Sequence, residues 1–217
     1  LRIAYSPNLG YATNVHPEIA AATAQAAQYL QDLGAVIEQV DPGIEDPLDI
    51  TTGLWFAGAY QVWRTLSKEQ QALTDPDFAA QAAIGETLDA NALHQLNQRR
   101  GLLGSHLRQF MQRFDLILTP STAVPAFKAL PAGHSPMNSE AMLGWTPFSY
   151  PFNLSQQPAI SLPCGLTADG LPMGVQLVGP MFADALVLRA AKALETCYVC
   201  LRPDLDADRP IDSASHS

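Results

Sequence analysis

The chain has 217 residues, of which 47% are hydrophobic and 15% charged, and its formal net charge is −9. Nucleic acid and anionic membranes are therefore poor partners, and no apolar run reaches the ~18 residues of a membrane span. Three cysteines do not make a disulfide framework. No basic, apolar leader precedes the first predicted strand, and we therefore expect a cytoplasmic protein.

The first predicted unit is a strand, a helix and a strand, over residues 1–5, 17–33 and 35–40. The first strand starts with no loose residues before it, which favours a cut or processed start over a native one. Pro17 suits the first helical turn, and Gly34 ends the helix. The apolar stripe of this helix consists of Ile19, Ala22, Ala26, Leu30 and Leu33. Such a unit predicts parallel strands joined by a right-handed crossover.

The sequence of residues 41–86 predicts a region with little regular structure, interrupted by prolines and containing one helix over residues 54–66. Its aromatic side chains either pack in the core or wall a substrate channel, and Trp55 is the candidate for the second role. A longer helix is predicted over residues 87–113, with an apolar face of Leu96, Leu103, Leu107, Phe110 and Phe114. His94 and His106 on this helix are too far apart to share a metal, so we expect them on the surface.

Three more strands are predicted over residues 115–119, 159–164 and 173–178. The first of them is apolar at its centre, as in a sheet covered on both faces. The dipeptide Asp169-Gly170 predicts a tight turn between the other two. A last helix begins at Asp184 or its neighbour and carries Leu186, Leu188, Ala190 and Leu194. The fold class is therefore α/β, with a mixed β-sheet core flanked by helices, in one domain over residues 1–200 followed by a polar, frayed tail over 201–217.

Residues 147–179, PFSYPFNLSQQPAISLPCGLTADGLPMGVQLVG, carry a resemblance to a known family. The segment resembles the C-terminal core of the amidase signature family, serine hydrolases that cleave carboxamides. The resemblance extends over most of the chain but covers only the second half of such an enzyme. It implies an amidase-signature-like C-terminal portion with no cofactor and no metal.

The resemblance also implies which catalytic groups this chain lacks. The family hydrolyses linear amides to an acid plus ammonia or an amine, with a nucleophilic serine, a second serine on a cis peptide bond and a lysine. The chain has no glycine- and serine-rich nucleophile loop, and none of its three lysines, Lys68, Lys128 and Lys192, has the expected context. We therefore predict no catalytic residue here, a triad outside the chain, and no activity of the chain alone.

What this half contributes, by the same resemblance, is the wall of a substrate pocket. In the glutamyl-tRNA amidotransferase branch a polar residue before the P-F-N-L turn holds the substrate's amino group. That position falls at or beside Thr146, flanked by Trp145 and Phe148. Thr146 is neutral where that branch has an acid, which favours an uncharged aryl or alkyl amide. Asn153 and Gln157 either tie the turn together or contact substrate, and the first reading is favoured.

Other nucleophiles and ligands find little support in the sequence. Ser105 and His106 lie within a predicted helix without a nucleophile elbow, and Ser121 reads as a loop serine at a strand end. Cys197 and Cys200 form a lone C-x-x-C without a second pair.

The alternative function is a catalytically inert, stand-alone domain that binds a small apolar ligand or a partner protein through an exposed sheet edge. The partners to consider are thus an amide substrate, an N-terminal amidase half, and a second copy of the chain pairing through that edge.

Overall fold

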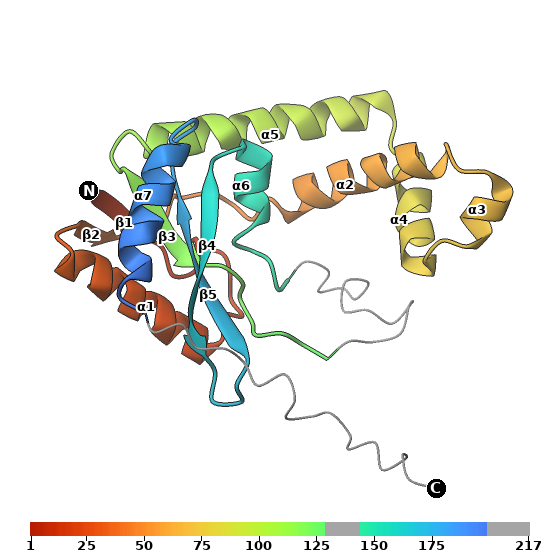
Figure 1. Ribbon diagram of the computed structural model, residues 1–217. Coiled ribbons are helices and arrows are strands. Elements are labelled where there is room, and N and C mark those ends of the chain that lie inside the picture. The colour runs from red at the N-terminus through yellow and green to blue at the C-terminus, as the bar shows by residue number, and fades with distance from the viewer. Residues whose placement is uncertain (129–143, 199–217) are drawn as a thin grey trace, which may run out of the picture.

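The computed structural model describes residues 1–128 and 144–198, and the predicted tail over residues 201–217 lies outside them. Its centre is a five-stranded sheet in the order β2-β1-β3-β5-β4 (Figure 1). The strands are β1 (Arg2–Tyr5), β2 (Val36–Gln39), β3 (Leu116–Pro120), β4 (Ala159–Leu166) and β5 (Pro172–Val178). β1 pairs in parallel with β2 and β3, whereas β5 is antiparallel to both β3 and β4. The predicted mixed α/β sheet is confirmed.

Helix α1 (Pro17–Asp32) connects the two parallel strands β1 and β2 as predicted. The His16 side chain accepts a hydrogen bond from the Glu18 backbone N–H at the helix start. The buried stripe includes Thr23, whose hydroxyl donates to the Ile19 carbonyl. The predicted burial of Leu33 is wrong, because this residue follows the last helical turn and its side chain is 51% exposed.

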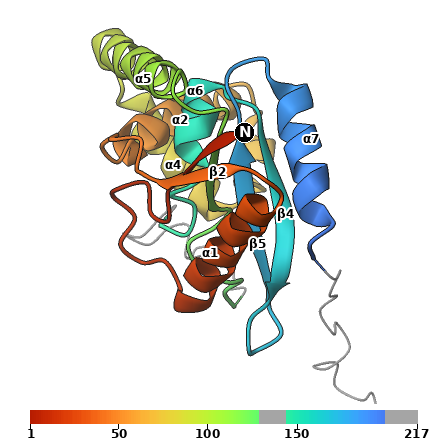
Figure 2. The ribbon, with the colours of Figure 1, turned by 90° about the vertical axis from the view of Figure 1, so that its left-hand side faces the viewer.

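β3 is the central strand and is buried along its whole length. Leu116 and Leu118 belong to the hydrophobic cluster beneath α1 and α7 (Asp184–Glu195). Ile117 points to the other face, into the cluster beneath α5 (Ala90–Phe110) and α6 (Tyr150–Ser155). Figure 2 shows these two helical layers on either side of the strands. The expected burial on both faces is confirmed.

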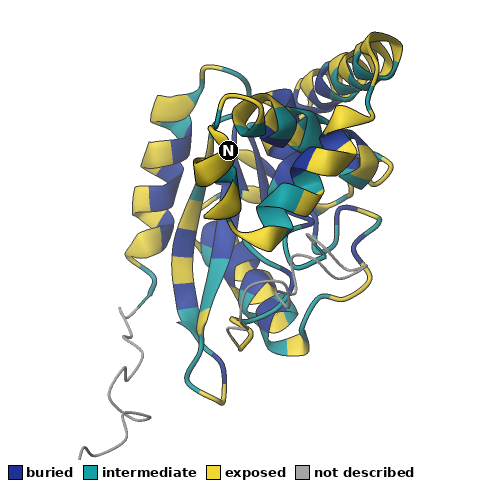
Figure 3. Ribbon diagram, turned by 90° about the vertical axis from the view of Figure 1, so that its right-hand side faces the viewer, coloured by how far each residue is buried: buried dark blue, intermediate teal, exposed yellow. Residues whose placement is uncertain are grey.

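The α5–α6 layer leaves part of the sheet uncovered at the β4 edge. Leu162 and Cys164 of β4 point into the cluster beneath α1 and α7. Strand alternation directs Ala159, Ser161 and Pro163 to the opposite face, where all three are exposed. Figure 3 shows exposed and buried positions alternating along the outer strand of the sheet. We call these three residues the open face of β4.

Residues 41–86 are more helical than predicted. The expected helix over 54–66 is α2 (Leu48–Trp63), which starts six residues earlier, directly after Pro47. Two further helices, α3 (Lys68–Ala72) and α4 (Pro76–Glu86), lie in the C-terminal part of the expected loose region. Ser67 and Gln70 form a capping box on α3, and Asp75 caps α4. Together α2, α3 and α4 form an arm that extends away from the sheet (Figure 1).

The arm is held tightly together and rests on α5. A side chain at Gly85 of α4 would place its Cβ 1.9 Å from the Phe56 carbonyl oxygen of α2. Gly53 of α2 receives the Leu96 side chain of α5 in the same manner, at 2.7 Å. α5 itself is shorter than the predicted 87–113 and begins after Asp89, whose side chain accepts from the Ala92 N–H.

The apolar face of the last helix is shifted from the predicted one. Leu188 is 59% exposed, and Val187 and Ala191 are buried in its place together with Ala190 and Leu194. Within residues 1–128 and 144–198, no helix is long and apolar enough to cross a membrane.

Candidate functional site

A pocket of about 530 Å³ lies where the arm meets α5 and α6. Its walls come from three parts of the chain that are distant in sequence: the first turns of α2, the middle of α5, and residues 145–154. The lining residues are Thr51, Leu54, Trp55, Arg100, Trp145, Thr146, Ser149, Tyr150, Asn153 and Leu154. We call this the arm pocket.

Three of the four predicted substrate-binding residues line the arm pocket. Trp55 is 58% exposed, and its indole nitrogen donates to Gln81 Oε1 at 3.1 Å, which fixes the ring between α2 and α4. Trp145 and Thr146 form the facing wall. Phe148 does not join them, because it is fully buried in the cluster beneath α5 and α6. Substrate contact by these residues stays a prediction.

Three of the ten lining residues of the pocket are aromatic, and one is a cation. Arg100 donates through Nε to the Leu154 carbonyl at 2.8 Å, near the C-terminal end of α6. The negative end of the helix dipole offsets part of the Arg100 charge there. Trp145 packs edge-on against Phe127, and its indole N–H is buried with no hydrogen-bond acceptor in the part of the chain that the structure describes.

Tyr150 forms part of the wall through a fixed ring. Its hydroxyl donates to Asp46 Oδ1 at 2.7 Å, and its ring stacks on Tyr11 at 6.5 Å between centroids. Burial, and then the hydrogen bond to Asp46, raise the pKa of Tyr150. Burial and the nearby Asp46 charge raise the pKa of Tyr11 in the same way. Both phenols thus keep their protons and act as donors.

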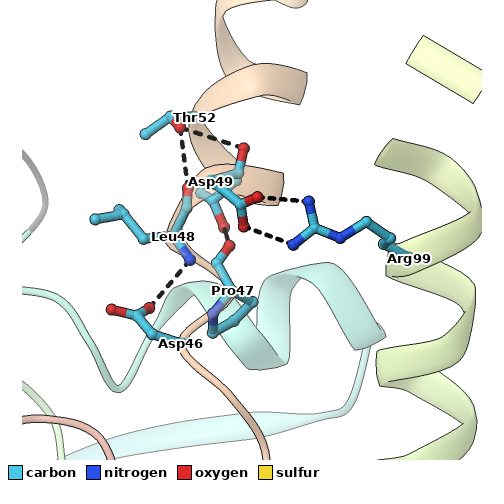
Figure 4. Close-up of polar contacts among 7 residues, drawn as sticks. Asp46, Pro47, Leu48, Asp49, Thr52 and Arg99 are labelled. Atoms are coloured by element: carbon cyan, nitrogen blue, oxygen red, sulfur yellow. Dashed lines mark hydrogen bonds and ion pairs between the residues drawn. The ribbon is translucent and has the colours of Figure 1, made fainter. Parts of the chain in front are cut away.

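An ion pair joins the start of α2 to α5 beside this wall (Figure 4). The Arg99 guanidinium makes two hydrogen bonds with the Asp49 carboxylate, at 2.5 and 3.0 Å. The hydrogen bond from Arg99 is the main cause that lowers the pKa of Asp49. Asp46 accepts from the Leu48 N–H at 3.0 Å and so caps the same helix end. The arm is therefore attached to the sheet domain by polar contacts as well as by packing.

The structure separates the two readings of Asn153 and Gln157. Gln157 is buried, donates to the Gly179 carbonyl at 3.1 Å and accepts from the Ser155 hydroxyl, so it holds the turn after α6. Asn153 is exposed and lines the arm pocket.

The alternative nucleophiles lie away from the pocket lining. Ser105 accepts from Arg108, and His106 Nε2 lies 2.6 Å from the Pro42 carbonyl oxygen. Ser121 forms a hydroxyl pair at 2.9 Å with Ser161 of the open face of β4. Burial raises the pKa of the Cys164 thiol to about 11. Cys200 lies outside the described residues, and the described residues contain no group of three His, Cys, Asp or Glu side chains placed to hold a metal ion.

Sequence reasoning missed Arg100 and Tyr150 as lining residues. Arg100 reaches a carbonyl 54 residues away, and Tyr150 reaches a carboxylate 104 residues away. Contacts of this kind leave no spacing pattern. The only local signal for Tyr150 was its place in the P-F-S-Y-P-F turn.

Comparison with known proteins gives consistent matches. The family profile described as Amidase matches residues 1–188. The acylamidase of Rhodococcus erythropolis is 32% identical over 98% of this chain and 44% of its own length. The crystal structure of a bacterial aryl acylamidase of the amidase signature enzymes matches with 27% identity and a TM-score of 0.75, covering 90% of this chain and 43% of that one.

A second solved structure, 6-aminohexanoate cyclic dimer hydrolase, shares the fold with a TM-score of 0.81 at 23% identity. It covers 94% of this chain and 46% of that one. The chain thus spans less than half the length of each of these proteins.

Proposed function

Because this chain belongs to the amidase signature family, we propose that the arm pocket is the substrate-holding part of an amidase. The reaction is the hydrolysis of a linear carboxamide to an acid plus ammonia or an amine. The Ser–cis-Ser–Lys triad that performs it lies outside these residues. The observation that carries the proposal is the convergence of Trp55, Trp145 and Thr146 on one cavity.

The chemistry of the pocket supports a neutral amide with an aryl or alkyl group. Trp55, Trp145 and Tyr150 offer flat apolar surface with little side-chain entropy to lose. Thr146 adds a hydroxyl but no charge. The printed names of two relatives, acylamidase and aryl acylamidase, agree with such a substrate.

The open face of β4 supports a second structural part that completes the enzyme. The exposed Ala159, Ser161 and Pro163 are small, so another segment can approach the sheet closely there. This face is connected to the arm pocket through the backbone: Ser121 pairs with Ser161, and two residues on, the Ala123 N–H donates to the Trp145 carbonyl. A triad carried by a part that packs on this face would stand beside the pocket.

Tryptophan fluorescence tests the pocket directly, because two of the chain's three tryptophans line it. We expect 4-nitroacetanilide, a neutral aryl amide that quenches indole emission, to bind the chain with saturation. Trp63→Phe keeps both pocket indoles and should leave the dissociation constant unchanged, whereas Trp145→Ala should weaken binding. Absence of saturable quenching would contradict the proposal.

Activity measurements test where the catalytic groups lie. The chain alone should release no 4-nitroaniline from the probe, and the chain joined to an amidase N-terminal half should release it. Turnover by the chain alone that Ser121→Ala abolishes would place the nucleophile here and overturn the proposal.

The alternative is an inert domain that binds an apolar ligand or a partner through a sheet edge. The β2 edge exposes Val36 but carries Glu38, which pairs with Arg2 and Arg113, and charges of this kind disfavour strand addition. The outer edge of β4 is the better candidate for self-association. Saturable binding without turnover in the joined protein, or a dimer in size-exclusion chromatography that a β4 proline disrupts, would favour this alternative.

A further inference from the structure

Five consecutive backbone carbonyls, from residues 144 to 148, each accept a hydrogen bond from a different donor. The donors, in order, are Asn14 Nδ2 at 3.0 Å, the Ala123 N–H at 3.0 Å, the Ser149 N–H at 3.0 Å, the Tyr11 hydroxyl at 2.5 Å and Gln176 Nε2 at 2.8 Å. This segment has no strand or helix of its own. It carries Trp145 and Thr146 of the arm pocket, so its backbone is fixed at the point where the predicted substrate contacts lie.

Two of the five bonds originate in one connection, residues 6–16 between β1 and α1, which also holds a third donor in place. Tyr11 and Asn14 bind the segment directly, and the His16 N–H binds the Ala123 carbonyl, whose own N–H binds Trp145. Gln176 contributes from β5 instead, where it is 7% exposed and also donates to Thr119 Oγ1.

The connection is itself anchored to the sheet domain. Ser6 donates to Asp41 Oδ1 at 2.6 Å and accepts from the Leu9 N–H at 3.0 Å. Leu9 is fully buried and takes a left-handed backbone conformation with φ of 54°, which requires the surrounding contacts to hold it. The connection can therefore transmit the position of the sheet to the pocket wall.

We infer that Tyr11 and Asn14 are positioning residues, which hold residues 144–148 so that Trp145 and Thr146 face the arm pocket before substrate arrives. The inference rests on the proposed function. A binding wall that is ordered in advance lowers the entropy cost of binding. Neither residue lines the pocket, so both act on substrate indirectly. Both hold the backbone of residues 144–148, and the Tyr11 ring also stacks on Tyr150, a contact that Tyr11→Phe keeps.

Amide hydrogen exchange of the whole chain tests the holding role. Tyr11→Phe keeps the ring that stacks on Tyr150 and deletes only the hydroxyl. We expect exchange of two amides that donate to this segment, Ser149 to Thr146 and Ala123 to Trp145, to accelerate by about five- to thirty-fold, the factor that corresponds to one lost hydrogen bond, while the strands keep their protection. Tyr29→Phe, on α1 beneath the other face of the sheet, is the matched control and should leave this segment unchanged.

Binding of 4-nitroacetanilide tests the link to substrate. Asn14 is exposed, so the double variant Tyr11→Phe/Asn14→Ala should fold, which thermal unfolding verifies. Apparent dissociation constants scale inversely with the fraction of competent molecules, so we expect the double variant to bind roughly three-fold or more weakly. Tyr29→Phe should bind like the unaltered chain.

The outcomes separate the two proposals. Unchanged exchange in Tyr11→Phe, or faster exchange with unchanged probe affinity in the double variant, would overturn the positioning role and leave the proposed function standing. Failure of the unaltered chain to bind the probe would refute the proposed function, and the positioning role for substrate would fall with it.

Discussion

The close contact between α2 and α4 gives a quantitative prediction about the arm. Gly85→Ala would place a methyl group 1.9 Å from the Phe56 carbonyl oxygen and 3.0 Å from Tyr60 Cβ. Real Cβ contacts do not fall below 3.0 Å, so the two helices must separate by about 1.1 Å. Overpacking of this kind costs about 1–3 kcal/mol, which exceeds the ~1 kcal/mol that alanine gains over glycine in a helix.

Gly58→Ala on α2 is the matched control, because nothing lies within 4 Å of its added Cβ. This variant should gain the full helix propensity of about 1 kcal/mol. For a chain of this size each kcal/mol shifts the melting temperature by about 2–4 °C, so the two variants should differ clearly and in opposite directions. Thermal unfolding followed by circular dichroism measures this difference.

The arm can also open locally without unfolding the sheet, and amide exchange of α2 and α4 detects that outcome. Gly85→Ala should then lose protection in both helices and, since α2 carries Trp55, bind 4-nitroacetanilide more weakly. Melting shifts of the same sign in Gly85→Ala and Gly58→Ala, with unchanged arm exchange, would refute the reasoning.

Three further predictions concern an ion pair, a hydroxyl pair and a buried thiol. The exposed Arg99–Asp49 pair should show a coupling energy of about 0.2–1 kcal/mol in a double-mutant cycle of Arg99→Met and Asp49→Asn. This coupling energy should fall in high salt, because solvent screens an exposed ion pair. A larger coupling energy that does not depend on salt would contradict this expectation. Gly174→Ala should displace Ser121, whose hydroxyl lies 3.0 Å from the added Cβ, and so break its hydrogen bond with Ser161. Unfolding in urea should then show a loss of about 1 kcal/mol in the free energy of unfolding. Ser161→Ala in the Gly174→Ala background should cause no further loss, because the hydrogen bond is already broken. Burial raises the pKa of Cys164 from 9.0 to about 11, so about one Cys164 thiol in a thousand is ionised at pH 8, and iodoacetamide should label Cys197 before Cys164 in peptide mass spectra. The contribution of the buried thiol to the free energy of unfolding is complete below pH 9. It declines as the pH rises toward 11, because the thiol of the unfolded chain loses its proton first.

The sheet was predictable because its signals are local. Residues 115–119 read as an interior strand, and the Asp169-Gly170 turn set the pairing of the last two strands. Helices α3 and α4 were missed although Ser67, Gln70 and Asp75 carry ordinary capping signals, since the surrounding prolines and polar residues favoured a loop.

The site was only partly predictable. Trp145 and Thr146 were proposed from a family resemblance and Trp55 from its aromatic neighbourhood, and the structure places all three in the lining of the arm pocket. Phe148 was misjudged in position, because the chain turns between Thr146 and Phe148 and directs this side chain into the core. Tyr11 and Asn14 act on carbonyls 136 and 130 residues away, and no pattern within the sequence marks such distant pairs.

The arm and α5 together fill the connection between two strands that both pair with β1. β2 ends at Gln39 and β3 begins at Leu116, and of the elements between them α5 packs on the sheet whereas the arm extends away from it. The entropy of closing a loop grows only logarithmically, so a doubled excursion costs only about 0.6 kcal/mol more. A longer or shorter arm therefore changes the closure entropy little, and since the arm supplies Trp55, exchanging it between related chains offers a way to change ligand preference while the sheet and α5 stay the same.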